Sequence, residues 1–276
     1  MTAGNKGMAY TREQARDYTS YYYETSLHRP QSYGKVAADF DGAGGSYGII
    51  QFNWKSGTCQ PIFKDMFTNH AADMAAVFTA TADYNTFYDV CFNRTTANQM
   101  VWGTSITILN ADGTKSNRVV EPWNTYFTNL GTYKSYQDRQ DVACQPYYDN
   151  ADRWISDFGL WTRRGYALMF DVAVQYGGIA TATHTDIMNW IAAQPTARIT
   201  PELVELRRMR YIANRLATDH AGGAFSGVAF DRKRAIANGN GNVYGYPAPT
   251  YTYDLLLEPN GLVAIPPLKK PRWQGL

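Results

Sequence analysis

Two carboxylates, Glu24 and Asp41, stand 17 residues apart around the part of this chain where residue types point most clearly to chemistry. Asp41 opens a glycine-rich turn, and an apolar run with amide side chains follows it. Asp39 lies close enough in sequence to compete with Asp41 for a catalytic role. Hydrolysis of a glycosidic bond needs such a pair: an acid that protonates the leaving oxygen and a carboxylate that handles water or the sugar cation.

The residues around these carboxylates fit the same chemistry. Glu24 follows a run of three tyrosines, and apolar surroundings favour the protonated carboxyl that a general acid needs. Ser46 offers a hydroxyl that can hold water, and Tyr47 offers an aromatic face for a sugar. Gln51 and Asn53 are two residues apart, so on a strand they point the same way, toward hydroxyl or N-acetyl groups. Taken singly, each residue also fits an ordinary helix end, turn or strand end.

Other chemistries have weaker signals. The four histidines are scattered without metal-ligand spacing, and neither a dinucleotide fingerprint nor a nucleophile elbow is present. Cys59, Cys91 and Cys144 lack CxxC spacing, so a zinc site is not expected, and a single disulfide stays open. We therefore expect neither a metal nor an organic cofactor.

Composition indicates a globular chain that binds no nucleic acid. Hydrophobic residues make up 45% and charged residues 18%, which is enough for a proper core. The net charge of only +2 argues against a nucleic-acid binder. No stretch approaches the roughly 20 apolar residues of a membrane span, and the N-terminus lacks the apolar region of a secretory signal. Most of the 21 Tyr, 7 Trp and 12 Phe are expected in the core or at interfaces.

Hydrophobic periodicity predicts mostly helices. We expect helices at 11–23, 61–81 and 151–194 and one from Pro201 to about 217. Within the third of these, residues 166–176 are apolar nearly all round, which is typical of a buried central helix, and Gly177 ends it. The glycine-rich region 32–53 favours a small strand or hairpin.

Two regions have a different character. Between about 85 and 149, Tyr, Thr and Asn become common and the helical period is lost. We interpret the region as an insertion or lobe over a cleft, or as an interaction surface. Inside it, turn residues between two β-prone runs predict a hairpin over 105–120. Residues 241–276 are rich in Pro and Gly and predict an extended tail, either docked on a partner or loose.

The N-terminal motifs resemble glycoside hydrolase family 46 chitosanases, which belong to the lysozyme-like superfamily. The resemblance is carried by residues 24–26, 41–52 and 56–58. It implies an α+β, mainly α, lysozyme-like two-lobed fold with a small sheet flanking the cleft, within a catalytic domain at 1–240. By the same resemblance Glu24 matches the general acid, Asp41 the general base, and Ser46 the residue that positions the attacking water.

The C-terminal half adds a second block of resemblance. Residues 167–177 resemble the family's central helix, and Asp171 then matches an acid that supports the catalytic Glu through arginine. Arg207 or Arg208 is the arginine we expect there. Residues 232–241 resemble a stretch of related lysozyme-like proteins.

One string favours peptidoglycan as the substrate. Ser46-x-Gly48-x-x-Gln51-x-Asn53 fits a pattern common in lysozymes. We therefore predict a peptidoglycan hydrolase of the muramidase or endolysin type, encoded by a phage. Such a protein is made in the host cytoplasm without a signal peptide and reaches the cell wall through holin-assisted lysis or in the virion.

Two alternatives stay open. A chitosanase would act on a polycation, so a strongly acidic cleft would favour it. A virion tail or baseplate protein with a lysozyme-like fold would contact other virion proteins through 85–149 or the tail, and large apolar patches there would favour it.

Overall fold

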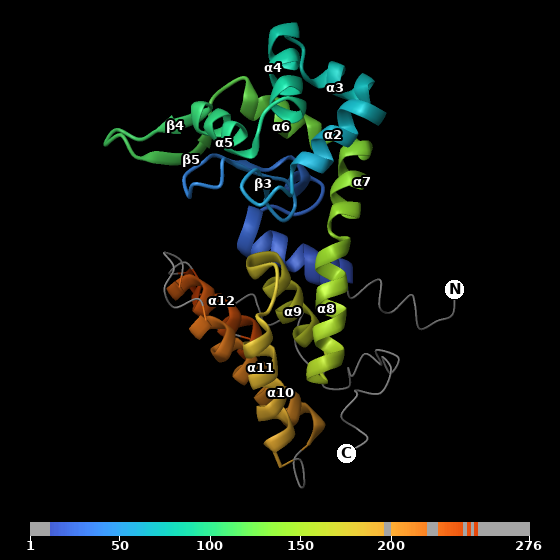
Figure 1. Ribbon diagram of the computed structural model, residues 1–276, viewed down its shortest axis with the longest axis vertical. Coiled ribbons are helices and arrows are strands. Elements are labelled where there is room, and N and C mark those ends of the chain that lie inside the picture. Colours follow the sequence, from blue (N-terminus) through green and yellow to red (C-terminus); the bar gives the residue numbers. More distant parts are fainter. Residues whose placement is uncertain (1–11, 196–199, 220–225, 240–241, 244–245, 248–276) are drawn as a thin grey trace. The chain divides into compact units, whose positions relative to one another are not determined.

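The computed structural model describes residues 12–195, 200–219, 226–239, 242–243 and 246–247 (Figure 1). The chain forms two compact units, which we name the central unit (residues 20–145) and the terminal unit (residues 1–19 with 146–276). The described residues are mainly helical with small antiparallel sheets. The predicted α+β, mainly α class is thus confirmed, and the domain limits 1–240 and 241–276 stay predictions.

The central unit holds a three-stranded antiparallel sheet in the order β1-β2-β3. Its strands are short: β1 Val36–Ala37, β2 Ser46–Tyr47 and β3 Phe52–Asn53. The register pairs Ser46 with Ala37 on one side and with Asn53 on the other. The strand or hairpin expected over 32–53 is therefore confirmed, and it carries the glycine-rich turn between β1 and β2.

Helices and one hairpin make up the rest of the central unit (Figure 1). The short helices are η1 Ser20–Thr25 and η2 Gln31–Gly34. The longer ones are α2 Gln60–Asn69, α3 Ala71–Val77, α4 Thr81–Phe92, α5 Thr96–Ser105, α6 Trp123–Leu130 and α7 Lys134–Ala143. The predicted hairpin is confirmed as β4 Thr107–Leu109 with β5 Lys115–Val119, which projects from the helices.

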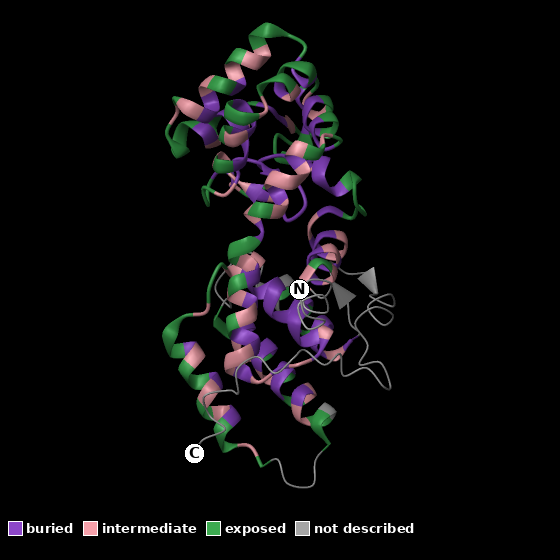
Figure 2. Cartoon of the chain, turned by 90° about the vertical axis from the view of Figure 1, so that its right-hand side faces the viewer, coloured by how far each residue is buried: buried purple, intermediate pink, exposed green. Residues whose placement is uncertain are grey.

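Aromatic side chains form the core of this unit. Trp54, Phe63, Phe87 and Phe127 are buried, and Phe63 meets Phe87 edge to face with ring centroids 4.9 Å apart. Figure 2 shows buried residues gathered inside each unit, whereas outward helix faces are exposed. Edge-to-face contacts between aromatic rings add about 0.5–1.5 kcal/mol per pair beyond area burial. The expectation that most aromatic residues serve the core is confirmed for this cluster.

The expected loss of helical period over 85–149 is wrong. Helices α4 to α7 lie there, and α4 passes residue 85 without a break. Only Phe87, Val90 and Cys91 of α4 are buried, so its apolar stripe is narrow, and the β-prone Thr, Tyr and Phe beside it hide the helical pattern. Residues 85–145 also belong to the same compact unit as 20–84.

The terminal unit is helical. Residues 12–19 form a helix, followed after the central unit by α8 Gln145–Phe158, α9 Arg163–Tyr176, α10 Thr181–Ala193, α11 Pro201–Asp219 and α12 Ser226–Asn238. Arg12 pairs with Asp152, to which Tyr166 also donates at 2.8 Å, and this ties the helix at 12–19 to α8 and α9.

Helix α9 is the centre of this unit. Its residues 164–173 are all buried, and it packs against α11 and α12. The Thr162 hydroxyl caps its start by accepting from Gly165 N, and Gly177 ends it with φ +68°. The predicted buried central helix and its glycine end are both confirmed.

Most of the predicted tail lies outside the described residues. Within 241–276 the structure describes only β6 Asn242–Val243 paired with β7 Tyr246–Pro247. In the described part of the chain, no helix combines the length and apolarity that crossing a membrane would take.

Candidate active site

Glu24 lies in an unusual helical turn. The segment Ser20–Thr25 is a π-helix, a rare form that appears mostly as single turns inside α-helices and is frequent at functional sites. Glu24 is half-buried between the buried side chains of Tyr23 and Thr25. The Thr25 hydroxyl donates to Ser20 O at 3.0 Å and accepts from Leu27 N at 3.0 Å. Side-chain bonds therefore fix the backbone on both sides of Glu24.

An aromatic pair lies close to Glu24 in sequence. The rings of Tyr21 and His28 stack with centroids 3.9 Å apart and planes 8° apart, and Tyr22 meets Tyr21 edge to face. Tyr21 and Tyr22 are half-buried and His28 is exposed. Sequence reasoning did not single out His28, because a histidine seven residues from its stacking partner leaves no periodic signal.

Asp41 stands exposed at the start of the glycine-rich turn. Its Oδ1 accepts from Ala43 N at 3.1 Å, which is an Asx turn. This bond orients the carboxylate while the group stays in contact with solvent. Asp41 can therefore act on water, as a general base must.

Asp39 has a different environment. It is 3% exposed, and its carboxylate accepts from Gly44 N at 2.7 Å, from Lys115 Nζ at 2.5 Å and from the Thr104 hydroxyl. Burial pushes the pKa of Asp39 up, but the hydrogen bonds from these donors outweigh burial and hold it below its ordinary value. Asp39 thus fixes the shape of the turn, and Asp41 is the better candidate for catalysis.

The turn is backed by residues from 103 to 117. A Cβ on Gly103 of α5 would lie 1.7 Å from Gly44 O, so only glycine allows this approach. Asp39 N donates to the Thr107 hydroxyl at 3.1 Å, and Ala38 N donates to Asn117 O at 3.2 Å. Helix α5 and the β4–β5 hairpin therefore support the segment that carries Asp41.

Ser46 and Tyr47 form β2 and are both buried. Ser46 is 9% exposed, beside the turn. The Tyr47 hydroxyl accepts from Trp54 Nε1 at 3.0 Å, and its ring packs on Phe63 with centroids 5.2 Å apart. Tyr47 is a core residue, so this position does not support the predicted contact with substrate.

Gln51 and Asn53 do not lie together on one strand, which corrects the expectation that their side chains point the same way. Gln51 has φ +58° and belongs to the turn before β3. Its amide donates to Gly48 O at 2.9 Å, and the Asn53 side chain accepts from Ser56 N at 2.8 Å. Both amides close turns in their own segment, and a role in substrate binding stays a prediction.

Gln140 is a residue that sequence reasoning missed. It lies on α7, fully buried, where its Oε1 accepts from Ile49 N at 2.8 Å and its Nε2 donates to Tyr33 O at 2.9 Å. Gly48 has φ +75°, and a Cβ there would lie 1.9 Å from Gln140 Oε1. One side chain therefore holds both the β2–β3 turn and the end of η2, although it lies about 90 residues or more away from them in sequence.

Asp171 is the buried acid of the terminal unit. It is 0% exposed in the middle of α9, and its carboxylate accepts from Arg232 Nε at 2.5 Å and from Lys233 Nζ. Lys233 also donates to Gln175 Oε1 at 2.5 Å. The basic partners of Asp171 thus come from α12.

The expected partners Arg207 and Arg208 are wrong for this position. Arg207 is exposed on α11, and Arg208 donates to Gly159 O at 2.7 Å. The sequence feature that could have identified the partners of Asp171 is the stretch 232–241. Its Arg232 and Lys233 fall on the buried face of α12 beside Ala235 and Ile236. Two adjacent basic residues on an apolar helix face indicate a buried carboxylate partner, because an unpaired buried charge is very costly.

Glu205 is a second buried acid that the sequence did not reveal. Its Oε1 accepts from Trp161 N at 2.9 Å, from Thr162 N at 2.8 Å and from the Thr162 hydroxyl at 2.8 Å. Burial is the main influence on it and raises the pKa of Glu205 above its ordinary value, against these bonds and the charge of Arg208. Glu205 therefore stabilises the turn that starts α9.

The structure distributes the predicted site residues over both units. Glu24, Asp41, Ser46, Tyr47, Gln51 and Asn53 belong to the central unit, and Asp171, Arg207 and Arg208 belong to the terminal unit. No cluster of His, Cys, Asp and Glu suited to a metal occurs in the described ranges. The three cysteines are buried free thiols.

Comparisons with known proteins give only a distant likeness. No family model and no curated protein matches the chain. Among solved structures, a mutant chitosanase from Bacillus subtilis MY002 complexed with 6 GlcN is 17% identical, with 85% of this chain and 90% of that chain covered and a TM-score of 0.49. The native chitosanase of the same strain is 16% identical, with 88% and 97% covered and a TM-score of 0.49. These values do not assign the chain to a family.

Proposed function

We propose that this protein is a glycoside hydrolase that cleaves β-1,4 bonds between amino sugars. The observation that carries the proposal is the arrangement around Asp41, an exposed carboxylate whose turn is held rigid by the buried Asp39. Glu24 supplies the second carboxyl, half-buried in a π-helical turn of the same unit. A rigid exposed base and a half-buried acid are the two environments that separate the two roles of a glycosidase.

The proposed reaction needs only these groups and water. Glu24 gives its proton to the glycosidic oxygen while the bond from that oxygen to the anomeric carbon breaks. Asp41 takes a proton from water, whose oxygen bonds to the anomeric carbon. Ser46 helps to hold this water. The products are two shorter sugars, one with a new reducing end.

The test of the two roles is hydrolysis by variants with matched controls. Glu24→Gln and Asp41→Asn should each lower the rate by roughly 100-fold or more, since acid–base groups contribute about 10²–10⁴-fold. Asp112→Asn is the control for Asp41, because Asp112 makes the same Asx turn, at 2.9 Å to Thr114 N, before a glycine with φ +81°. Glu13→Gln, exposed in the helix at 12–19, is the control for Glu24.

Both controls should keep the wild-type rate, and all four variants should keep the wild-type circular dichroism spectrum. A folded Glu24→Gln variant with full activity would remove Glu24 from the mechanism. Equal losses of hydrolysis rate in Asp41→Asn and Asp112→Asn would show that the rate depends on turn geometry and not on the Asp41 carboxylate.

The proposed stereochemistry is inversion. A base that activates water on the face opposite the leaving group inverts the anomeric carbon, and a nucleophilic carboxylate retains it. Proton NMR of the first products should therefore show the α-anomer before mutarotation. Initial release of the β-anomer would make Asp41 a nucleophile.

The proposed polymer is peptidoglycan, degraded by an endolysin-type enzyme of a phage. This choice rests on the string from Ser46 to Asn53. In the structure the amides of Gln51 and Asn53 build the turns on either side of β3, so the string specifies the hairpin that follows Asp41. Chitosan is the second polymer to test, since its bonds also join amino sugars.

A further inference from the structure

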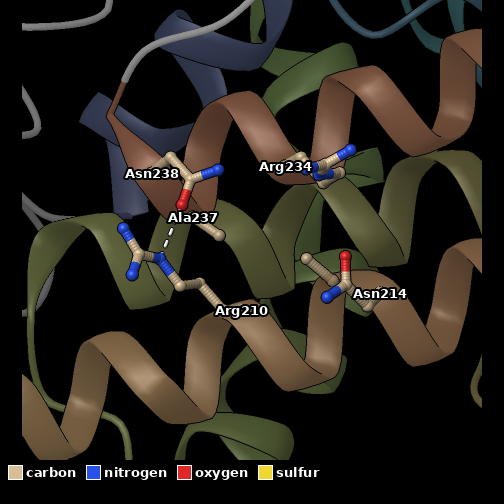
Figure 3. A pocket seen from close by; sticks show the side chains of 6 residues that line it. Arg210, Asn214, Arg234, Ala237 and Asn238 are labelled. Carbon is tan, nitrogen blue, oxygen red and sulfur yellow. Dashed lines mark hydrogen bonds between the residues drawn. The ribbon is translucent and has the colours of Figure 1, made fainter.

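The terminal unit contains a pocket of about 230 Å³ between α11 and α12 (Figure 3). Across it, Arg210 Nε donates to Asn238 Oδ1 at 2.7 Å. This bond joins the two helices, so we attribute Arg210 and Asn238 to the packing of the terminal unit. A group suited to binding, which the proposed reaction does not use, lies instead in the central unit, at the exposed ring of Phe40.

Phe40 is presented to solvent beside the candidate base. It lies between Asp39 and Asp41 and is 49% exposed. From residue 36 to residue 50, Phe40 and Asp41 are the exposed residues, and all the others except Gly42 are buried. Adjacent Cα atoms are about 3.8 Å apart, so a molecule that contacts the Asp41 carboxylate comes within reach of the Phe40 ring.

The exposure of this ring differs from that of the other exposed aromatic residue, Tyr88, which is 43% exposed. Tyr88 stacks on Phe92 with centroids 4.5 Å apart and meets Phe67 edge to face at 5.3 Å, so it covers the core. Phe40 makes no ring contact among the residues that the structure describes. A half-exposed phenylalanine forgoes much of the stabilisation that burial gives. Stability of the fold therefore does not account for an aromatic ring at this position.

The backbone that carries Phe40 is held on its N-terminal side. Phe40 N donates to Ala38 O at 2.9 Å, which closes a three-residue turn over Asp39. Asp39 is anchored in turn by Gly44 N and by Lys115 Nζ. The ring thus projects from a fixed backbone, and a phenylalanine has only two side-chain torsions. A contact with this ring costs little conformational entropy.

Given the proposed hydrolysis, on which this contact rests, we propose that Phe40 binds the substrate by packing its ring against an amino sugar next to the scissile bond. The C–H groups on one face of a pyranose ring are apolar and can cover an aromatic ring. Phe40 exchanges no proton, and the contact exists before and during the reaction. Such uniform binding lowers KM and leaves kcat unchanged. Phe40 therefore positions the sugar chain along the turn while Asp41 acts on water.

The test is steady-state hydrolysis of two soluble substrates, uncross-linked glycan chains from peptidoglycan and the hexamer of glucosamine. On the substrate that wild type cleaves, Phe40→Ala should raise KM roughly fivefold to tenfold, as expected for losing the exposed half of a phenylalanine ring. The kcat should stay within about twofold of wild type. Phe40→Tyr keeps the flat ring and should keep KM, whereas Phe40→Leu keeps an apolar side chain without the ring and should raise it.

Tyr88→Leu is the matched control for Phe40→Leu. It also removes an exposed ring from the central unit, and it should leave KM unchanged. Circular dichroism and urea denaturation check that every variant folds, and Phe40→Leu is the test variant if Phe40→Ala does not. Equal increases of KM in Phe40→Leu and Tyr88→Leu would show a general effect of lost aromatic surface and would overturn the proposed contact.

Binding without turnover separates this contact from the proposed reaction. In the Glu24→Gln background, NMR titration with the same substrate should give a Kd that Phe40→Leu raises by the same factor as KM. If wild type hydrolyses the substrate while both Phe40 variants keep KM and Kd, the contact is wrong and the proposed function stands. A loss confined to kcat would also overturn the contact. No hydrolysis of either substrate by wild type would overturn the proposed function and the contact together.

Discussion

Burial separates two aspartates that look equivalent in the sequence. Asp39 and Asp41 flank one residue, yet Asp39 is 3% exposed and surrounded by donors whereas Asp41 is exposed. The donors to Asp39 come from residues 44, 104 and 115, of which only the first is local. Sequence spacing alone therefore could not distinguish the structural aspartate from the candidate base.

Replacing Asp39 by asparagine should destabilise the protein. The side-chain oxygen of the asparagine can still accept from Gly44 N, but the ion pair with Lys115 and the bond from Thr104 are lost, at a cost of roughly 1–3 kcal/mol in the free energy of unfolding. Urea denaturation measures this cost, and Asp112→Asn, on an exposed turn, should stay within about 0.5 kcal/mol of wild type.

The effect of Asp39→Asn should also depend on pH. Because the folded-state pKa of Asp39 lies below its ordinary value, its carboxylate contributes stability above the unfolded pKa of about 3.9 and loses it as pH falls through the folded value. The stability difference between wild type and variant should thus be constant between about pH 5 and about pH 7 and shrink below about pH 4. A difference that stays constant down to about pH 2 would contradict the assigned role.

The stability contributed by Glu205 should change with pH in the opposite direction. Its folded-state pKa is raised by burial, so its contribution is fully present below the unfolded pKa of about 4.3 and is lost as pH rises through the folded value. Glu205→Gln keeps an oxygen for the bonds from Trp161 and Thr162 but cannot ionise. Thermal melts between about pH 4 and about pH 8 should show wild type losing stability relative to this variant as pH rises. Parallel curves would show that ionisation of Glu205 does not lower the stability of the folded protein.

At the residue scale, the sequence points to charged groups more readily than to their environments. Glu24 and Asp41 were selected because their types and spacing fit one reaction, and their catalytic roles stay predictions. We predicted substrate contacts for Tyr47, Gln51 and Asn53. In the structure Tyr47 lies in the core, and the amides of Gln51 and Asn53 form hydrogen bonds within their own turns. Whether a polar group meets a ligand or the backbone depends on tertiary contacts that no local pattern contains.

At the scale of elements, helices distant in the sequence hold the segment that carries Asp41. Gln140 of α7 bonds Ile49 N and Tyr33 O, and Gly103 of α5 touches Gly44. These contacts come from the region that we interpreted as an insertion or an interaction surface. The helical pattern is weak in α4, whose apolar stripe is narrow, whereas α6 buries Trp123, Tyr126, Phe127 and Leu130 at helical spacing, a signal that the interpretation overlooked. The support of the turn could not be predicted, because single polar or small residues make it.

Replacing Gln140 by methionine tests this support. The variant keeps similar length but removes the acceptor of Ile49 N and the Gln140 donor to Tyr33 O. Loss of a hydrogen-bond partner by a buried group costs roughly 1–3 kcal/mol. Urea denaturation should show a loss of about 2–4 kcal/mol, whereas Gln31→Met, at an exposed position of η2, should change little. A loss below about 0.5 kcal/mol in Gln140→Met, typical of surface positions, would contradict the role of α7.

At the scale of the whole molecule, the chain divides into a contiguous and a discontinuous unit. Residues 20–145 follow one another, whereas the terminal unit combines both ends of the chain. The sequence predicted the mainly helical class and the central helix α9, because long periodic segments are clear. It placed no boundary near 20 or 145, because no linker separates the units: the helix at 12–19 runs directly into η1, and α8 starts two residues after α7 ends.

The central unit should fold alone. It has its own aromatic core around Trp54, Phe63 and Phe87 and its own sheet. A fragment of residues 20–145 should therefore unfold cooperatively in urea and keep a near-ultraviolet circular dichroism signal from buried aromatic rings. A noncooperative transition without that signal would show that the unit depends on the rest of the chain.

The proposed function is hydrolysis of a bond between amino sugars by Glu24 and Asp41. Its most direct test is digestion of purified peptidoglycan and of chitosan, side by side, by wild type and by Glu24→Gln, with products identified by mass spectrometry. We expect sugar fragments with new reducing ends from peptidoglycan, released by wild type alone. Products from chitosan alone would keep the reaction and change the substrate. Products cut at peptide or amide bonds, or no products from either polymer, would show that the protein is not a glycoside hydrolase of amino-sugar polymers.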